Sequence, residues 1–199
     1  MGETDTFEDL IRRVRAGDQE AAAELVRTYE PAIRRAARIR LTDSRLRRVF
    51  DSMDISQSVF ASFFLRAALG QYEIDEPDRL LRLLVSMSRK KLADHVREEQ
   101  AARRDYRRLE DGPHAEKKML AQDTGPVQQV ALDELVREFR VRLSPEERRL
   151  ADLRAAGANW AQIALDVGDG AEALRKKLTR AINRIATELG LDAYDDEQP

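Results

Sequence analysis

The chain has 199 residues, of which 42% are hydrophobic, 36% are charged and only 6% are aromatic. This mixture is too apolar for wholesale disorder, and with few Gly and Pro residues it favours an all-α protein. The formal net charge is only −2, and the sequence contains no Cys, which excludes disulfides and thiolate metal sites.

The N-terminus, MGETDTFEDL, is acidic and lacks the apolar core of a signal peptide. No apolar run approaches the roughly 20 residues that are needed to span a bilayer. We therefore expect a cytoplasmic protein without membrane insertion.

Helical periodicity predicts a compact bundle over residues 7–100. Asp18 follows Gly17 and is the predicted N-cap of the second helix, which is expected to run as far as Pro31. The sequence resumes its helical pattern after that proline. The helices expected in this bundle cover residues 7–14, 18–31, 32–41, 53–69 and 80–97.

The helix expected over 53–69 carries a polar stripe among its apolar residues. Asp54, Gln57 and Ser58 share one side of a helical wheel with Ala61 and Leu65. A solvated face is one interpretation. The two apolar members favour a docking face, because a purely solvated stripe is more often charged.

Periodicity decays over residues 101–130, where Gly112-Pro113 and Gly125-Pro126 interrupt the sequence. We expect a flexible linker there, with a short helix over 116–121. A second, smaller module is expected over 131–190, followed by an acidic tail over 191–199.

Within the second module, Ser144 and Glu147 have the spacing of a capping box, and Pro145 fits the first helical position. Further on, a short helix has Trp160 on its apolar side and is followed by a turn at Gly168. A basic helix comes next, so this segment predicts a helix-turn-helix.

The basic helix places Leu174, Leu178 and Ile182 inward, which leaves its polar residues outside. Arg and Lys near the start of such a helix reach guanine edges or phosphates in the major groove, and Thr offers a hydroxyl or a methyl group. A solvated face is the alternative, but five cations cluster here with one acid, Glu172. The candidate DNA-binding residues are Arg175, Lys176, Lys177, Thr179, Arg180 and Arg184.

No enzymatic activity, cofactor or metal is predicted. The two histidines, His95 and His114, lie far apart in the sequence. There is no nucleophile elbow, phosphate-cradling glycine loop or metal-spaced cluster of ligands.

Two widely separated segments resemble one known family. The first is MDISQSVFASFFLRA, which is similar to the Asp-Ile/Val-x-Gln-x-Val-Phe signature in region 2.2 of bacterial sigma factors. The second is GANWAQIALDVGDGAEALRKKLTRAINRI, which resembles region 4.2, where a Gly-x-x-x-x-x-Ile-Ala helix precedes a recognition helix ending in Leu-x-Arg-Ala. With the order, size and linker, the chain resembles the extracytoplasmic-function (ECF) group of the sigma-70 family, which retains only the second and fourth sigma domains.

The resemblance implies a transcription initiation factor that is not an enzyme. Such a factor binds core RNA polymerase, reads the minus-ten and minus-thirty-five promoter elements and helps to open the DNA. The implied partners are the beta-prime clamp and beta flap of the polymerase and promoter DNA, with an anti-sigma factor as a further candidate. Residues 7–100 would form sigma region 2 and residues 131–190 sigma region 4.

The resemblance also implies roles for particular residues. The core polymerase-binding residues would be Asp54, Gln57, Ser58, Phe60 and Ala61. The minus-thirty-five element would be read by the basic helix, with base-facing positions at Arg175, Lys176, Thr179 and Arg180. The minus-ten element would be bound by Tyr72, Arg89, Lys90, Lys91 and Arg97, with Tyr72 as the candidate for stacking on unpaired bases. The sequence departs from the family at two positions. Asp169 stands where the family usually has an apolar residue, and Leu83 stands where the family often has Trp.

Two alternatives stay open at this point. One is a self-sufficient helix-turn-helix regulator, in which residues 1–100 serve dimerisation or sensing. The other is a protein-interaction bundle, such as an adaptor or an anti-sigma partner, with no DNA role.

Overall fold

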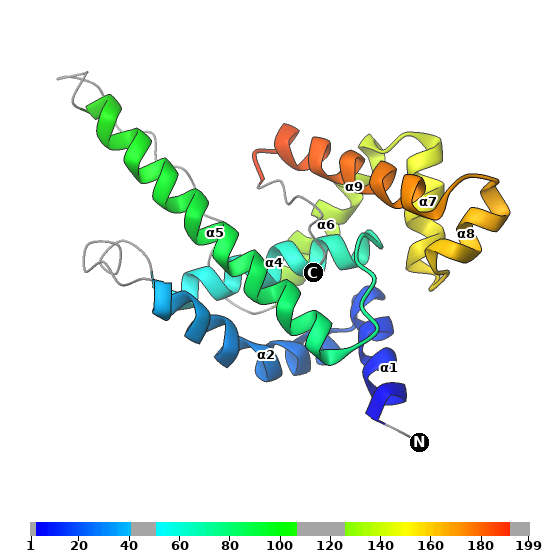
Figure 1. Ribbon diagram of the computed structural model, residues 1–199, viewed down its shortest axis with the longest axis horizontal. Coiled ribbons are helices and arrows are strands. Elements are labelled where there is room, and N and C mark those ends of the chain that lie inside the picture. The colour runs from blue at the N-terminus through cyan, green and yellow to red at the C-terminus, as the bar shows by residue number, and fades with distance from the viewer. Residues whose placement is uncertain (1–2, 41–50, 107–125, 192–199) are drawn as a thin grey trace.

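The computed structural model describes residues 3–40, 51–106 and 126–191. Every regular element in these ranges is a helix, which confirms the predicted all-α class (Figure 1). We call α1, α2, α4 and α5 the first bundle and α6–α9 the second bundle. The helices are α1 (Glu3–Arg15), α2 (Gln19–Arg40), α4 (Ser52–Ala68), α5 (Pro77–Tyr106), α6 (Pro126–Arg142), α7 (Pro145–Ala155), α8 (Trp160–Val167) and α9 (Ala171–Glu188). No helix in the described ranges is both long and apolar enough to span a membrane.

Helix α2 begins as predicted, because Asp18 Oδ1 accepts a hydrogen bond from the N–H of Ala21 at 3.0 Å. The helix then continues through Pro31, so the expected division at this proline is wrong. Proline removes one helical hydrogen bond. The residues on either side, Tyr29 and Ile33, are both buried on the core face of α2, and their packing outweighs that local preference.

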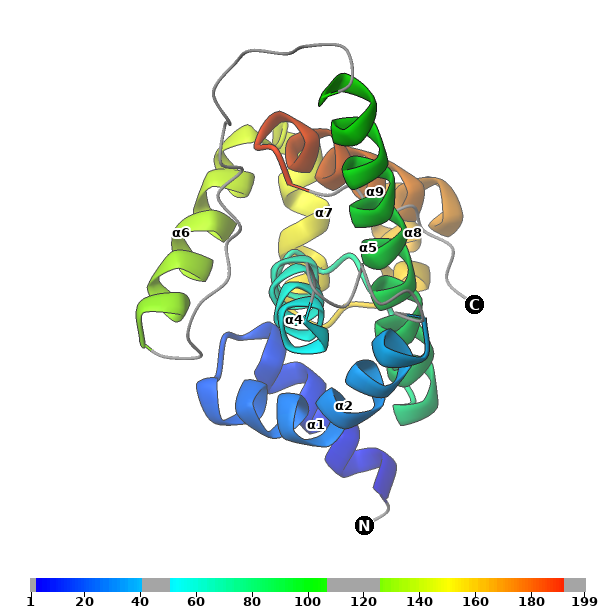
Figure 2. The same ribbon diagram turned by 90° about the vertical axis from the view of Figure 1, so that its left-hand side faces the viewer.

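Helix α4 lies between α1 and α2 on one side and the second bundle on the other, in both views of the molecule (Figures 1 and 2). Asp51 caps its start, since Asp51 Oδ1 accepts from the N–H of Met53 at 3.2 Å. The hydrophobic core of the first bundle, which we call the first core, determines which side of α4 faces inward. This core includes Phe7, Ile11, Leu25, Ile33, Val59, Phe63, Leu80 and Leu84.

Helix α5 is longer than predicted and projects beyond its neighbours (Figure 1). It starts at Pro77, a residue suited to the first turn of a helix, and ends at Tyr106. Helix α6 then begins at Pro126. The end of α5 and the start of α6 both fall within residues 101–130, where the linker is expected. The short helix expected over 116–121 lies outside the described residues, as does the acidic tail after residue 191.

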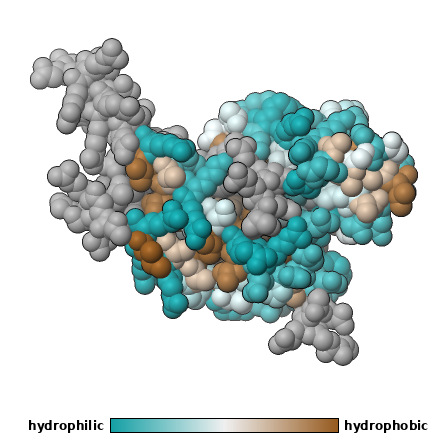
Figure 3. Space-filling model, viewed as in Figure 1, coloured by the Kyte–Doolittle hydropathy of each residue, from teal (hydrophilic) through white to brown (hydrophobic). Residues whose placement is uncertain are grey.

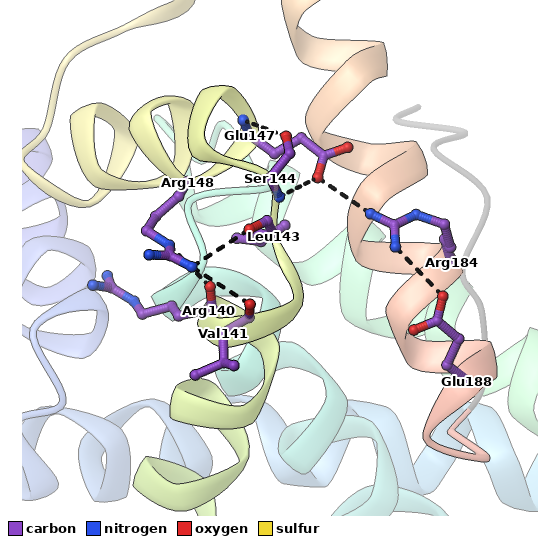
Figure 4. Close-up of polar contacts among 8 residues, drawn as sticks. All are labelled: Arg140, Val141, Leu143, Ser144, Glu147, Arg148, Arg184 and Glu188. Atoms are coloured by element: carbon purple, nitrogen blue, oxygen red, sulfur yellow. Dashed lines mark hydrogen bonds and ion pairs between the residues drawn. The ribbon is translucent and has the colours of Figure 1, made fainter.

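The corner between α6 and α7 has the predicted capping box (Figure 4). Ser144 Oγ accepts from the N–H of Glu147 at 3.2 Å, and Glu147 Oε2 accepts from the N–H of Ser144 at 2.9 Å. Arg148 completes the corner by donating to the main-chain oxygens of Arg140 at 3.0 Å and Val141 at 3.4 Å. These bonds satisfy carbonyl groups that the end of α6 leaves without helical partners.

Helices α8 and α9 form the predicted helix-turn-helix. Gly168 ends α8 with φ of 79°, a left-handed conformation that favours glycine. Asp169 Oδ1 accepts from the N–H of Gly170 at 2.7 Å, so this carboxylate supports the turn where the resembled family usually has an apolar residue. Trp160 is buried in the hydrophobic core of the second bundle, which we call the second core, as predicted.

The second core extends into the first bundle, and the sequence did not predict this contact. Leu65 and Leu69, at the end of α4, are buried together with Phe139 of α6. Nearby, Arg66 Nη2 donates to Asn183 Oδ1 of α9 at 3.3 Å. The two bundles are therefore packed against each other through the end of α4.

Candidate docking surface and nucleic-acid interface

The polar stripe of α4 is accessible along most of its length. Asp54, Gln57 and Ser58 are half-buried and Ala61 is exposed. Across the described part of the chain, no ion pair or side-chain hydrogen bond engages the first three. Leu65 continues the stripe by one turn but is buried in the second core. A partner that docks on α4 therefore meets a nearly uncharged face whose far end is covered.

Phe60, which the family signature includes, lies in the first core. Its side chain is 5% exposed, and its ring stacks on Phe64 with centroids 5.9 Å apart. The placement does not support a direct contact with a partner, since Val59 and Phe63 beside it are also core residues. Phe60 instead packs within the first core.

The exposed face of α9 is basic, but it differs from the predicted one. Lys176, Arg180 and Arg184 are exposed. Thr179 is only 5% exposed, and the Arg175 side chain is 16% exposed. Both residues are expected on the open face, but neither lies there. Thr179 lies one turn before Asn183, which contacts Arg66 of the first bundle. This side of α9 is therefore covered rather than open to solvent, and at Asn183 it contacts the first bundle.

Acidic side chains hold most of the cations of α9. Glu172 binds both Arg175 at 2.8 Å and Lys176 at 3.3 Å. These contacts, with the Arg175 hydrogen bond foremost, lower the pKa of Glu172 to about 2. Arg180 differs, since no ion pair to it is found within the described residues.

The remaining cations of α9 are tied to the start of α7. Lys177 pairs with Glu146. Arg184 binds Glu147 Oε2 at 3.2 Å and Glu188 at 3.4 Å (Figure 4). Because Glu147 also belongs to the capping box, its carboxylate links the helix-turn-helix to the α6–α7 corner.

The residues predicted for the minus-ten element are divided between surface and core. On α5, Arg89 is exposed, and Arg97 is exposed but pairs with Asp94 at 3.1 Å. Lys90 and Lys91, on the same helix, are half-buried.

Tyr72 is buried in the first core, where its ring stacks on Phe63 with centroids 5.9 Å apart and an interplanar angle of 6°. The ring is therefore not available to an unpaired base in this arrangement, and its predicted stacking role gains no support. The tyrosine has instead the packing of a core aromatic residue.

Sequence reasoning missed two buried arginines, Arg66 and Arg154. Arg154 follows Leu150 by four residues and Ala151 by three, so it falls on the buried side of α7. That spacing is a signal that the sequence does contain. A further omission is Leu165, an apolar residue that is 86% exposed on α8, where hydrophobic surface is visible (Figure 3).

The comparisons with known proteins come to one positive finding. The family model described as ECF sigma factor matches residues 4–190, a span that includes both α4 and α9. No curated protein and no solved structure was found to match the chain.

Proposed function

The chain belongs to the ECF sigma factor family, and we propose that it binds core RNA polymerase through α4 and directs the enzyme to promoters through α9. Members of this family act in transcription initiation. The observation that carries the proposal is the pairing, within one matched span, of an open polar stripe and an exposed basic helix-turn-helix.

The stripe of Asp54, Gln57, Ser58 and Ala61 docks on the beta-prime clamp. Its half-buried polar groups have no ion pairs to give up among the described residues, so a partner can bind them with little loss. Leu165, exposed at the surface of the second bundle, suits a contact with the beta flap, where apolar area contributes to binding.

Helix α9 binds the minus-thirty-five element. Arg180 is the leading candidate for a base contact, because it is exposed and without an ion pair within the described residues. Lys176 and Arg184 contribute phosphate contacts, which fix the register on DNA and make binding depend on salt. Arg89 and Arg97 of α5 are the corresponding candidates at the minus-ten element. A contact with an anti-sigma factor stays a prediction.

Two weak DNA contacts on one polypeptide support each other once polymerase fixes their separation. The second contact then forms at a high effective concentration. This arrangement distinguishes the proposal from a self-sufficient regulator, which needs tight operator binding by the free protein.

The test is transcription with core polymerase from the source organism, reconstituted with the chain, followed by sequencing of transcript 5′ ends. We expect starts that share two upstream DNA elements, and loss of all starts with Asp54→Arg. Failure to bind core polymerase together with failure to initiate would refute the proposal. Tight binding of a symmetric operator by the free chain, with a dimeric mass, would favour the regulator instead.

A further inference from the structure

The end of α2 carries a dense group of arginines. Residues 34–40 read RRAARIR, a segment with four Arg and no acid. Arg35, Arg38 and Arg40 are exposed, and Arg34 is half-buried. The helix dipole favours cations at a helix C-terminus, but its effect is confined to the last turn. Arg34 and Arg35 precede that turn, so the dipole does not account for the whole group.

Few partners within the chain neutralise these arginines. Arg34 has a single carboxylate partner, Glu30, at 3.8 Å. Arg35 has no ion pair or side-chain hydrogen bond among the described residues. Arg38 donates from Nε to Ser52 Oγ at 3.3 Å, a contact that leaves its charge uncompensated. The end of α2 therefore presents positive charge that is available to a partner.

The basic face of α9 differs in this respect. Carboxylates hold each of its cations apart from Arg180, as far as the described residues show. DNA that binds α9 must displace these acids, so the gain from each phosphate contact is reduced. A protein that binds DNA gains most of its sequence-independent affinity from cations that neutralise phosphates. The end of α2 has such cations without competing acids.

The arginines of α2 form a row along one side of the helix. Arg27, Arg34 and Arg38 follow one another at steps of seven and four residues, and Arg35 flanks them. Ile33 and the other buried residues of α2 lie on the opposite side. We call Arg27, Arg34, Arg35 and Arg38 the α2 row. At a rise of 1.5 Å per residue the row is about 16 Å long, which is too long for one small anion to engage.

An open hollow lies along the end of this row. The residues that line it are Glu30, Pro31, Arg34, Arg35, Arg38 and Ile39. Pro31 is exposed, and the Ile39 side chain is 67% exposed, so apolar groups lie among the cations. A sugar–phosphate backbone has the matching character, because arginines bind its phosphates and apolar side chains contact its sugars.

The α2 row lies apart from the helix-turn-helix. In both views α2 is on the side of the first bundle that faces away from the second bundle (Figures 1 and 2). The bond from Arg38 to Ser52 places the end of the row beside the start of α4. A partner of the row is therefore separate from the DNA segment that α9 is proposed to bind.

Phosphates fit the row better than an acidic protein surface does. One strand of B-DNA has a phosphate about every 3.4 Å along the helix axis, so about five phosphates fall within the length of the row. Arg binds phosphate with two parallel hydrogen bonds, and every cation of the row is Arg. An acidic patch of polymerase has no such regular spacing. Its contact with the row is the alternative that the experiment must exclude.

We propose that the α2 row binds the phosphate backbone of duplex DNA without reading its sequence. The row supplies salt-dependent affinity, while base contacts elsewhere in the chain supply sequence choice. The inference rests on the proposed function for its role at promoters. Binding of DNA by α2 is itself a property of the free chain.

The experiment measures how DNA binding by the free, full-length chain depends on salt. The probe is a labelled duplex of unrelated sequence, followed by fluorescence anisotropy. We compare the parent with the double variant Arg35→Gln/Arg38→Gln. The matched control is Arg12→Gln/Arg137→Gln, which makes the same change in net charge at exposed positions of α1 and α6.

The double variant is expected to reduce the slope of log affinity against log salt concentration by about 1.8, since each lost phosphate contact contributes about 0.9. Its loss of affinity between about 50 and 200 mM salt should be about 10-fold smaller than that of the parent. The control should keep the slope of the parent. Arg35→Lys/Arg38→Lys should keep it as well, because it retains both charges.

Circular dichroism establishes that each variant keeps its helices. If the loss of the bond from Arg38 to Ser52 unfolds the double variant, Arg35→Gln alone serves instead, with an expected reduction in slope of about 0.9. Arg35 has no side-chain partner among the described residues to lose.

A second measurement, the affinity of each variant for core polymerase without DNA, separates the two proposals. A slope equal to that of the parent, an equal change in the control, or an equal change in the Lys variant overturns DNA binding by the row. So does weaker polymerase binding with an unchanged slope, which assigns the row to polymerase. A reduced slope that is specific to the Gln variant, in a chain that binds no polymerase, supports the row and refutes the proposed function.

Discussion

Helices α4 and α9 each present a polar face, but the two faces are held in different ways. The α4 stripe contains one acid, Asp54, and no ion pair among the described residues. The α9 face is strongly basic, and acids from α7 and from α9 itself pair with most of its cations. A partner of α4 therefore adds contacts, whereas DNA at α9 must first displace carboxylates. This difference predicts that polymerase binding comes first and that DNA reading by α9 alone is weak.

The strongest test of the comparison is charge reversal on α4. We expect Asp54→Arg to weaken binding to core polymerase by over about 100-fold, because an unpaired, mismatched charge in a desolvated interface costs several kcal/mol. Titration calorimetry or competition with another sigma factor measures this loss. The half-buried position of Asp54 at the start of α4 permits the variant to fold.

A matched control is Ala23→Arg, which adds a cation at an exposed position of α2. This variant should bind polymerase as the unmodified chain does. If both substitutions have equal effects, the α4 stripe is only a solvated face.

The next largest effect is expected from Arg180→Ala on α9. Loss of a bidentate base contact costs about 1–3 kcal/mol, or roughly 5- to 150-fold, and relaxes selectivity at one position. Lys176→Ala removes a phosphate contact. It should weaken binding to all DNA sequences alike and reduce the slope of log affinity against log salt concentration by about 1. Holoenzyme binding to promoters with a randomised upstream element distinguishes these effects. Equal changes in selectivity would mean that Arg180 contacts only phosphate.

A smaller effect, in the opposite direction, is expected from Glu172→Gln. This change releases Arg175 and Lys176 from their shared carboxylate while keeping its shape. We expect binding of the holoenzyme to upstream-element DNA to strengthen by about 2- to 5-fold, since ion pairs to an exposed carboxylate are weak and are given up at little cost. Unchanged affinity across salt concentrations would show that these ion pairs do not compete with DNA.

Acid titration gives the smallest and most local effect. The lowered pKa of Glu172 means that its ion pairs stabilise α9 fully above the ordinary glutamate value of 4.5. This contribution is lost as pH falls from 4.5 through about 2. The thermal stability of Glu172→Gln, followed by circular dichroism, should therefore be below that of the unmodified chain above pH 4.5, and the difference should disappear as pH falls to about 2. Coincident titration curves would contradict a stabilising role for the carboxylate.

Local rules predicted those parts of the fold that depend on neighbours in sequence. Asp18, Ser144 and Gly168 act in caps and turns as expected, because each satisfies backbone groups within a few residues of itself. The break expected at Pro31 failed because buried residues on both sides of it belong to one core face. Tertiary packing therefore keeps α2 continuous through Pro31, and a rule based on neighbours in sequence does not take such packing into account.

The candidate surfaces were predicted less well, for the same reason. A helical wheel identifies the outward side of α9 but not which residues at its edge are buried by tertiary packing, so it misplaces Thr179. Tyr72 was chosen for its position in a polar segment, yet its ring fills the core beside Phe63. Arg154 is a basic residue, a type that is ordinarily assigned to solvent, although its spacing from Leu150 places it inside.

The position of Trp160 beneath the Arg154 guanidinium has a spectroscopic consequence. It is the single tryptophan of the chain, so ultraviolet excitation addresses one site without any label. The ring is 4% exposed and has the cation 5.0 Å from its centroid. A change in the placement of that cation alters the electric field across the indole and shifts its emission. The emission maximum of the intrinsic fluorescence therefore reports on the contact between Arg154 and Trp160 in unlabelled protein, in real time.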